Sequence, residues 1–368
     1  MRISNLTVQN FRNYSDLNLS PDEHLNIFLG RNAQGKTSLL EAVYILATAR
    51  SWKASKDAEL IRWGSDYARL TGKVIRDQQN DLEIEVILNK NGKKEIGLNT
   101  IRQTKLAEMI GQVNVVLIEP HNEEIVRGEP SRRRKFLNLE ISQIQPQYCH
   151  LLMNYRRVLE QRNRFLKDLC RRKSADSVLD VLDDQLTVHG AELVKRRLAF
   201  LDKISSFSTS IHSRITDGSE ELVIEYSSSL DLNSTDLAQA FRDRLAQVKE
   251  EEIRRGMTLA GPQRDDLIFK LNGIDARIYG SQGQQRTIAL SLYLALYEVM
   301  EESAGESPIV LLDDVMTDLD EMRREHIFEM TSGRCQTLLT AASRRAFDPQ
   351  MLSSARVFQV VDGQVIQE

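Results

Sequence analysis

The sequence has no long apolar run, few cysteines and no repeats, and each absence narrows the class of protein. No segment approaches the roughly 20 apolar residues that span a bilayer, so we expect no membrane-embedded part. The three cysteines among 368 residues show no CxxC spacing, which argues against a zinc site or a disulfide framework. The first ten residues, MRISNLTVQN, already have a strand pattern, so we expect no signal peptide and a cytoplasmic protein.

An excess of one charge sign is also lacking overall. The formal net charge of −4 argues against a wholly basic nucleic-acid binder. From 132 to 173, however, twelve Lys and Arg residues accompany only three acids, so that segment carries +9 and the rest of the chain −13. Charge separated in this way produces a local positive field that the net value does not report.

Two α/β portions flank a segment whose apolar residues follow a different spacing. Short β-rich runs such as LNIFLG (25–30) lie in the first portion and PIVLLDD (308–314) in the last, whereas apolar residues between the two portions recur at helical spacing. We predict an α/β lobe whose first part covers 1–135 and whose second part covers 256–368. A mostly helical insert, or arm, occupies 136–255.

The stretch NIFLGRNAQGKTSLLEAVYILA (26–47) contains Gly30-x4-Gly35-Lys36-Thr37 between an apolar strand and an apolar helix. This is the phosphate-binding loop pattern in the context that gives it meaning. The glycines let backbone N–H groups point at phosphates at the positive end of a helix. Lys36 bridges the β- and γ-phosphates of ATP, and Thr37 is placed to ligate Mg²⁺. The predicted ATP-binding residues are Gly30, Arg31, Asn32, Ala33, Gln34, Gly35, Lys36, Thr37 and Ser38.

A second stretch, SPIVLLDDVMTDLD (307–320), supplies acidic groups. Its apolar run predicts a strand buried on both faces of a parallel sheet, and it ends in Asp313 and Asp314. Asp313 would hold the Mg²⁺ water shell, and Asp314 would orient or deprotonate the attacking water. Asp314 and Lys36 are therefore the predicted catalytic residues. A strand that simply ends in a solvated acidic turn is the alternative.

The turn GSQGQQR (280–286) precedes an apolar helix and contains no nucleophile or metal-ligand cluster. The Ser281 hydroxyl and the Gly283 N–H stand at the expected helix start, where they would complement a phosphate. The alternative is that the turn only caps its own helix.

The order of phosphate loop, long insert, Ser-x-Gly-Gln turn and Asp-Asp strand resembles that of the ABC-type ATPases. This resemblance implies a P-loop NTPase fold of the ABC/SMC-head type with an inserted, mostly helical second domain. It also implies that ATP is held between two copies of the protein, which hydrolysis then releases. The residues implied to contact the ATP of the other copy are Ser281, Gln282, Gly283 and Gln284.

The blocks NFRNY (10–14), GEPSRRRKFLN (128–138), GPQRDDLIFKLNG (261–273) and LLDDVMTDLD (311–320) resemble the bacterial RecF proteins more narrowly. This resemblance implies a nucleoid-associated ATPase of DNA repair and replication. It would bind single-stranded and duplex DNA, favour gaps or junctions, and help to load the RecA recombinase with RecO and RecR partners.

Some positions depart from the family patterns. Asp314 stands where ABC and SMC proteins usually have Glu, so we expect slow ATP turnover. The usual switch histidine is absent, and LLTAASRR (338–345) offers Thr340 or Ser343 instead. Gln263 replaces a histidine that RecF proteins often show. These differences put the rate of hydrolysis in question more than nucleotide binding.

The basic segment offers contacts to DNA phosphates, although a solvated helix face is the alternative. No base-reading motif is visible, so we expect structure-selective rather than sequence-specific binding. The candidate DNA-binding residues are Arg132, Arg133, Arg134, Lys135, Arg156 and Arg157.

Two further groups have two interpretations each. Arg12 either approaches the nucleotide or has an ordinary surface role. Arg264, Asp265 and Asp266 either couple the helix that follows the GSQGQQR turn to the nucleotide or form a structural ion-pair cluster. We favour the ion-pair cluster. For the whole protein, the alternative function is an ABC-type ATPase subunit that drives transport or serves a nuclease.

Overall fold

The computed structural model describes residues 1–172, 177–316, 321–331, 333–347 and 349–368. The last four residues of LLDDVMTDLD, 317–320, and Lys173 of the basic segment lie outside this range. No helix of the described ranges is both long and apolar enough to cross a membrane.

The described chain forms two compact units. The α/β unit comprises Met1–Asn122, Arg214–Asp217 and Ala289–Glu368, and the helical unit comprises Glu123–Ser213 and Gly218–Ile288. Residues 123–135 and 256–288, which we expected in the α/β lobe, thus group with the helices. The expected domain limits at 135 and 255 stay predictions.

A six-stranded sheet in the order β15-β14-β3-β13-β12-β8 is the base of the α/β unit. Every residue of β3 (Leu25–Leu29), β12 (Ile309–Asp313) and β13 (Thr337–Ala341) is buried, as expected of parallel strands covered on both faces. β8 (Val115–Ile118) and β14 (Arg356–Val361) extend the parallel part, and β15 (Gln364–Gln367) pairs antiparallel. β13 alone separates β3 from β12.

The second sheet of this unit is antiparallel, in the order β2-β1-β4-β5-β6-β7. Burial alternates along its longer strands, so one face packs on the core while the other faces solvent. The strands are β1 (Arg2–Phe11), β2 (Tyr14–Leu19), β4 (Tyr67–Ile75), β5 (Leu82–Asn89), β6 (Lys94–Leu98) and β7 (Ile101–Gln103).

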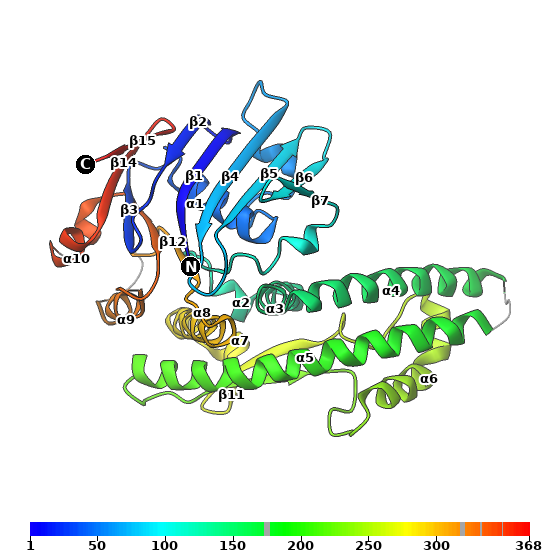
Figure 1. The fold of residues 1–368 in the computed structure, drawn as a ribbon. Helices are drawn as coiled ribbons and strands as arrows, with labels where there is room; N and C mark the ends of the chain where they lie inside the picture. The colour runs from blue at the N-terminus through cyan, green and yellow to red at the C-terminus, as the bar shows by residue number, and fades with distance from the viewer. Residues whose placement is uncertain (173–176, 317–320, 332, 348) are drawn as a thin grey trace. The chain divides into compact units, whose positions relative to one another are not determined.

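Helix α1 (Lys36–Thr48) lies between the two sheets (Figure 1), because it contacts β4 and β5 of one sheet and β8, β12 and β13 of the other. Only Thr37 and Ser38 among its residues are not buried. A helix that is apolar on all sides needs such a position between two layers. The core therefore fixes this helix and leaves Thr37 and Ser38 of its first turn half-buried.

The other elements of the α/β unit are short or peripheral. They are η1 (Asp57–Leu60), η2 (Leu106–Glu108), α9 (Glu321–Thr331), η3 (Arg344–Ala346) and α10 (Pro349–Ser354). Helix α8 (Gln282–Ala304) belongs to the helical unit up to Ile288 and to the α/β unit from Ala289 onward.

Long helices dominate the helical unit, and Figure 1 shows the two longest, α4 (Pro146–Arg172) and α5 (Ser177–Ile215), side by side. Helix α3 (Pro130–Ile144) begins with a proline at a position that needs no backbone donor. The remaining elements are α2 (Glu124–Arg127), β9 (Leu222–Ser227), α6 (Leu237–Arg255), β10 (Asp266–Leu271), β11 (Ile274–Asp275) and α7 (Ala276–Tyr279).

A buried arginine joins three helices of this unit. Arg162 of α4 is 0% exposed, and its guanidinium lies 2.5 Å from Asp183 of α5 and 2.7 Å from Glu252 of α6. Removing one partner of such a buried pair leaves an uncompensated charge, at a cost of about 3–5 kcal/mol. Arg162 is one of the twelve basic residues of the positive segment, and it holds helices together rather than facing solvent.

The fold class is confirmed at this level. The runs expected to form strands at 25–30 and 308–314 contain β3 and β12, and the segment expected to be mostly helical contains α4, α5 and α6. The helical segment also contains β9, which pairs antiparallel with β10.

Candidate functional site

The loop after β3 has a backbone that only glycine permits at two points. A Cβ on Gly30 would lie 2.3 Å from the carbonyl oxygen of Val360, and Gly35 has φ +115°. The side chain of Asn13 donates to the carbonyl of Gln34 (2.8 Å), and the Tyr14 hydroxyl donates to that of Gly35 (3.1 Å). The turn after β1 and the start of β2 therefore brace the loop.

Lys36 is the first residue of α1, and its side chain folds back over this loop. Its ammonium donates to the carbonyl oxygens of Gly30 (2.7 Å) and Arg31 (3.0 Å). Burial lowers the pKa of Lys36 below its ordinary value, while the charges of Asp314 and Asp313 oppose that shift. A cation held above a curled loop is the arrangement that receives phosphate oxygens.

Asp313, the last residue of β12, is buried among polar partners from three other segments. Its carboxylate accepts hydrogen bonds from the hydroxyls of Thr37 (2.7 Å) and Thr340 (2.9 Å), and it lies 3.1 Å from the ammonium of Lys53. Because β12 and β3 are one strand apart, the sheet brings Thr37 to an acid 276 positions away. The expected pairing of Thr37 with Asp313 is therefore a contact of the structure.

Asp314 has a backbone conformation that L-residues seldom adopt, with φ 53°. Its N–H donates to both the carbonyl (3.2 Å) and the hydroxyl (3.0 Å) oxygen of Thr340. Residues held in this region cost about 1–3 kcal/mol and are concentrated at functional sites. The strain turns the chain directly after Asp313, so both acids line the same cavity.

This cavity measures about 850 Å³, a size usual for small-molecule sites. Of the nine predicted ATP-binding residues, six line it and three line a second cavity of about 500 Å³. The first group is Asn32, Ala33, Gly35, Lys36, Thr37 and Ser38; the second is Gly30, Arg31 and Gln34.

The donor set around Asp313 fits Mg²⁺. Thr37 and Asp313 offer hard oxygen atoms, and the ammonium of Lys53 shows that a cation is already stabilised beside this carboxylate. The described residues contain no group of three or more His, Cys, Asp or Glu that could hold a metal. Mg²⁺ bound together with nucleotide phosphates needs only one or two protein carboxylates, so the two residues are sufficient.

Arg12 lines the cavity but is held by the protein. Its guanidinium makes a two-point contact with Glu41 of α1, at 2.8 and 2.9 Å. Glu41 is 1% exposed and also accepts a hydrogen bond from Ser51. Arg12 therefore stands on the cavity wall with its guanidinium held by Glu41. Its approach to a nucleotide stays a prediction.

The turn GSQGQQR (280–286), here named the signature turn, lies in the helical unit and caps the helix that follows it. The Ser281 hydroxyl accepts from the N–H of Gln284 (3.2 Å), and the Gln284 side chain accepts from the N–H of Ser281 (2.9 Å). This is a capping box. Ser281, Gln282 and Gly283 are exposed, so a phosphate can approach the helix start without rearranging the core.

The six DNA-binding candidates have different environments. Arg132, Lys135, Arg156 and Arg157 are exposed, and Arg134 is half-buried with one N–H donated to the carbonyl of Asp265 (2.9 Å).

Arg133 is 1% exposed. Its guanidinium contacts Asp266 at 2.6 and 2.9 Å and also donates to backbone carbonyls of the residues before α3. The prediction that Arg133 contacts DNA therefore does not fit the structure, because its donors are used within the helical unit.

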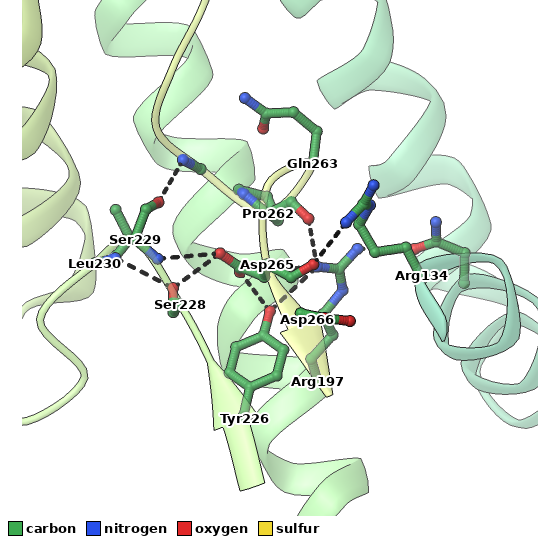
Figure 2. Close-up of polar contacts among 12 residues, drawn as sticks. Arg134, Arg197, Tyr226, Ser228, Ser229, Leu230, Pro262, Gln263, Asp265 and Asp266 are labelled. Carbon is green, nitrogen blue, oxygen red and sulfur yellow. Dashed lines mark hydrogen bonds and ion pairs between the residues drawn. The ribbon is translucent and has the colours of Figure 1, made fainter. Parts of the chain in front are cut away.

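Asp265 is the centre of a buried polar network, which Figure 2 shows. Its carboxylate accepts from the hydroxyls of Tyr226 (2.5 Å) and Ser228 (3.0 Å) and lies 3.8 Å from Arg197. Burial raises the pKa of Asp265 above its ordinary value, and the Tyr226 hydrogen bond and the charge of Arg197 oppose the rise. Asp265 faces Arg197 and Asp266 contacts Arg133 (2.6 Å), whereas Arg264 donates to the carbonyl of Thr258 (2.9 Å). The interpretation as a structural cluster therefore fits the two acids, but their partners are arginines other than Arg264.

Sequence reasoning missed Lys53 and left Thr340 as one of two options. Lys53 follows α1 without a motif, and no sequence signal would have placed it at Asp313. Thr340 is the last but one residue of β13, which pairs with β12 and places Thr340 opposite Asp313. Ser343, the other option, accepts from the N–H of Arg345 and caps η3.

The sequence matches a family described as RecF/RecN/SMC N terminal domain over residues 2–365. It is 42% identical to the DNA replication and repair protein RecF of Bacillus subtilis (strain 168), over 100% of both chains. It is also 42% identical to the protein of the same name from Oceanobacillus iheyensis, over 99% of this chain and 100% of that protein.

Solved structures agree with these sequence matches. A structure of the recombination mediator protein RecF-ATP in the RecFOR pathway superposes with a TM-score of 0.93 at 32% identity, over 100% of this chain and 97% of the other. A crystal structure of the Smc head bound to the C-winged helix domain of ScpA, at 14% identity, gives a TM-score of 0.57, and 100% and 97% of the two chains are covered. That likeness concerns the fold alone. The chain thus has the ABC/SMC-type head fold and belongs to the RecF family.

Proposed function

We propose that this protein is an ATP-dependent DNA-binding protein of replication and repair, in which ATP joins two copies. Its relatives are named DNA replication and repair proteins, and a solved relative is described with ATP. One observation carries the two-copy arrangement. A Cβ on Gly283 would meet nothing closer than the Ser281 hydroxyl at 3.9 Å, so the chain's own packing does not require glycine there.

The open space around Gly283 leaves room for a ligand at the signature turn. Its residues Ser281, Gln282 and Gly283 are exposed, and the turn stands at the positive end of a 23-residue helix, which favours an anion. Glycine at such a site lets another molecule's phosphate approach the backbone closely. Ser281, Gln282, Gly283 and Gln284 would thus contact the ATP that a second copy binds.

Within one copy, different residues of the 850 Å³ cavity would bind the phosphates and activate the attacking water. Lys36 would leave the carbonyls of Gly30 and Arg31 and bind phosphate oxygens. Asp314 would accept a proton from, or orient, the attacking water. Thr340 positions both acids through the hydrogen bonds already described.

Mg²⁺, held by Thr37 and Asp313, would neutralise phosphate charge when it is bound. Lys53 lies beside Asp313 and carries the same sign of charge. Lys53 must therefore withdraw from Asp313 when the nucleotide and its metal enter. The short carboxylate arm of Asp314, compared with Glu, suits slow hydrolysis and a long-lived ATP-bound state.

The proposed partners are DNA, a second copy of the chain, and mediators of the RecO and RecR type. Exposed cations on α3 and α4 supply the attraction for single-stranded, duplex or junction DNA. The resemblance to RecF supplies the mediators and the help in loading RecA. We place this activity in the cytoplasm, where the DNA is.

Light scattering with and without ATP and Mg²⁺ tests the two-copy arrangement. We expect wild type to change from monomer to dimer with ATP, and Lys36→Met to remain monomeric because it lacks the phosphate-binding cation. Ser281→Arg should bind ATP normally in a fluorescence titration and yet stay monomeric. If Ser281→Arg loses ATP binding itself, or wild type stays monomeric at saturating ATP on and off DNA, the arrangement is wrong.

A further inference from the structure

The helical unit contains a cavity of about 220 Å³ that the nucleotide site does not use. Residues of α3, α4, α5 and the segment before β10 line it. Among these lining residues none is acidic and four are cationic: Arg134, Lys135, Arg156 and Arg197. Arg197 is balanced by Asp265 at 3.8 Å, so the net positive charge at the cavity comes from Arg134, Lys135 and Arg156. A concave site with an excess of charge of one sign attracts an anion.

One wall of the same cavity is apolar. Leu152 and Leu159 of α4, Leu193 of α5 and Pro262 contribute to it. Leu193 is 0% and Leu152 9% exposed, so this wall belongs to the packed core and is fixed. A ligand that fills the cavity must combine an anionic group with an apolar or flat part.

The polar side of the cavity is also fixed before any ligand binds. Arg197 is 2% exposed. Its guanidinium donates to the oxygen atoms of Tyr148 (3.0 Å), Tyr226 (3.1 Å), Pro262 (2.7 Å) and Asn138 (3.0 Å).

Gln263 accepts from the Tyr155 hydroxyl and donates to the carbonyl of Ala260 (2.8 Å). Figure 2 shows Arg134, Arg197 and Gln263 gathered around the segment that leads into β10. Side chains locked in this way lose little freedom when a ligand binds.

We propose that this cavity binds one unpaired nucleotide of a DNA strand, with its phosphate against Lys135 and Arg156 and its base against the apolar wall. The inference rests on the DNA binding proposed above and names the part of the DNA that is recognised. A base inside a duplex stays stacked and cannot reach such a wall, whereas an unpaired base can leave the stack at little cost.

The surroundings of the cavity favour a nucleic acid over an acidic peptide. Exposed Arg132, Arg157, Arg164 and Lys167 lie on the same two helices, α3 and α4, as the lining cations. A surface with cations at many positions suits a polymer that carries one negative charge at every unit. An acidic peptide bound in the cavity would use only the cations that line it, and would leave those on the rest of α3 and α4 without a role.

Adjacent arginines on α4 provide a matched comparison. Arg156 lines the cavity and Arg157 does not, although both are exposed. We would measure fluorescence anisotropy of wild type, Arg156→Ala and Arg157→Ala with two DNA molecules, a full duplex and the same duplex with a short single-stranded gap. We expect Arg156→Ala to weaken binding to gapped DNA by about ten-fold, and both variants to lose the same small factor on duplex.

A second variant tests the apolar wall without changing charge. Leu159→Phe should fill the cavity, remove the preference for gapped DNA and leave duplex affinity unchanged. A 2-aminopurine in the gap should brighten when wild type binds, because the base leaves its stacked neighbours, and should not brighten with Leu159→Phe. If Arg156→Ala fails to fold by circular dichroism, Lys135→Ala with Arg132→Ala as its control repeats the comparison.

The outcomes separate this inference from the proposed function. Absence of binding by wild type to either DNA contradicts the proposed function. Binding with equal losses for Arg156→Ala and Arg157→Ala on gapped DNA overturns the nucleotide cavity alone. A labelled acidic peptide containing phenylalanine that binds wild type and not Arg156→Ala, while gapped-DNA binding is unaffected, assigns the cavity to a peptide and also overturns it.

Discussion

The two glycine-containing phosphate elements of this chain differ in what requires the glycine. In the loop after β3, a Cβ on Gly30 would collide with the Val360 carbonyl at 2.3 Å, so the fold itself excludes a side chain. In the signature turn, a Cβ on Gly283 would find its nearest neighbour at 3.9 Å. The fold excludes nothing there. The fold thus requires the glycine of the first element, whereas the glycine of the second is the one that we propose another molecule's phosphate approaches.

The same contrast holds for the polar groups. Lys36, Thr37 and Asp313 already contact one another's segments and share a cavity. The turn at Ser281 bonds with Gln284, three residues on, and faces solvent. Substitutions in the loop after β3 should therefore affect the stability and ATP binding of one molecule. Substitutions in the signature turn should affect only the association of two molecules.

The largest effect is expected at Asp314. Asp314→Asn removes the group that would accept a proton, so ATP hydrolysis should fall by about 10²–10⁴-fold, while ATP binding and dimer formation remain. Steady-state phosphate release gives the rate, and light scattering gives the dimer. Unchanged hydrolysis would show that another group activates the water.

Gly30→Ala should damage the single molecule. The new Cβ forces β3 and β14 apart, which we expect to lower the free energy of unfolding by about 1–3 kcal/mol and to weaken ATP binding. Chemical denaturation measures the first effect and a fluorescent nucleotide the second. A stable variant with normal ATP affinity would mean that the loop relaxes without cost.

Gly283→Ala should do the opposite. Alanine favours a helix over glycine by about 1 kcal/mol, so the free energy of unfolding should stay equal or rise slightly. The proposed ATP-dependent dimer should weaken by about ten-fold, because the methyl group would stand where we propose that the other copy's phosphate approaches. A dimer of unchanged affinity would remove the main support for ATP held between copies.

Lys53→Gln gives the smallest expected effect. Without the ammonium, Asp313 becomes available to a metal, so half-maximal hydrolysis should need about three-fold less Mg²⁺, as expected for a partly exposed ion pair of less than about 1 kcal/mol. Titration of Mg²⁺ at fixed ATP measures this shift. A requirement for more Mg²⁺ would indicate that Lys53 assists the bound nucleotide instead.

The strand, loop and helix around Lys36 could be predicted because each follows from local sequence. The contact of Thr37 with Asp313 followed from the family order of motifs and depends on strand order in the sheet. Lys53 could not be found in this way, because nothing in WKAS (52–55) marks a residue that reaches Asp313.

The burial of Arg133 has a signal in the sequence. Helix α3 begins at Pro130, whereas we expected the helical segment to begin at 136. With the earlier start, Arg133 falls three and four positions before Phe136 and Leu137, which are buried, and residues at that spacing share one helix face. Helical phase would therefore have distinguished Arg133 from the exposed Arg132.

The single strand between β3 and β12 has an evolutionary consequence. Because β13 alone sets the separation of Thr37 and Asp313, the chain that joins them by sequence can change in length without altering their contact. Turns of α4 and α5 can therefore be gained or lost while Thr37 and Asp313 stay in contact. Diversification of the arm need not be matched by any change in the sheet.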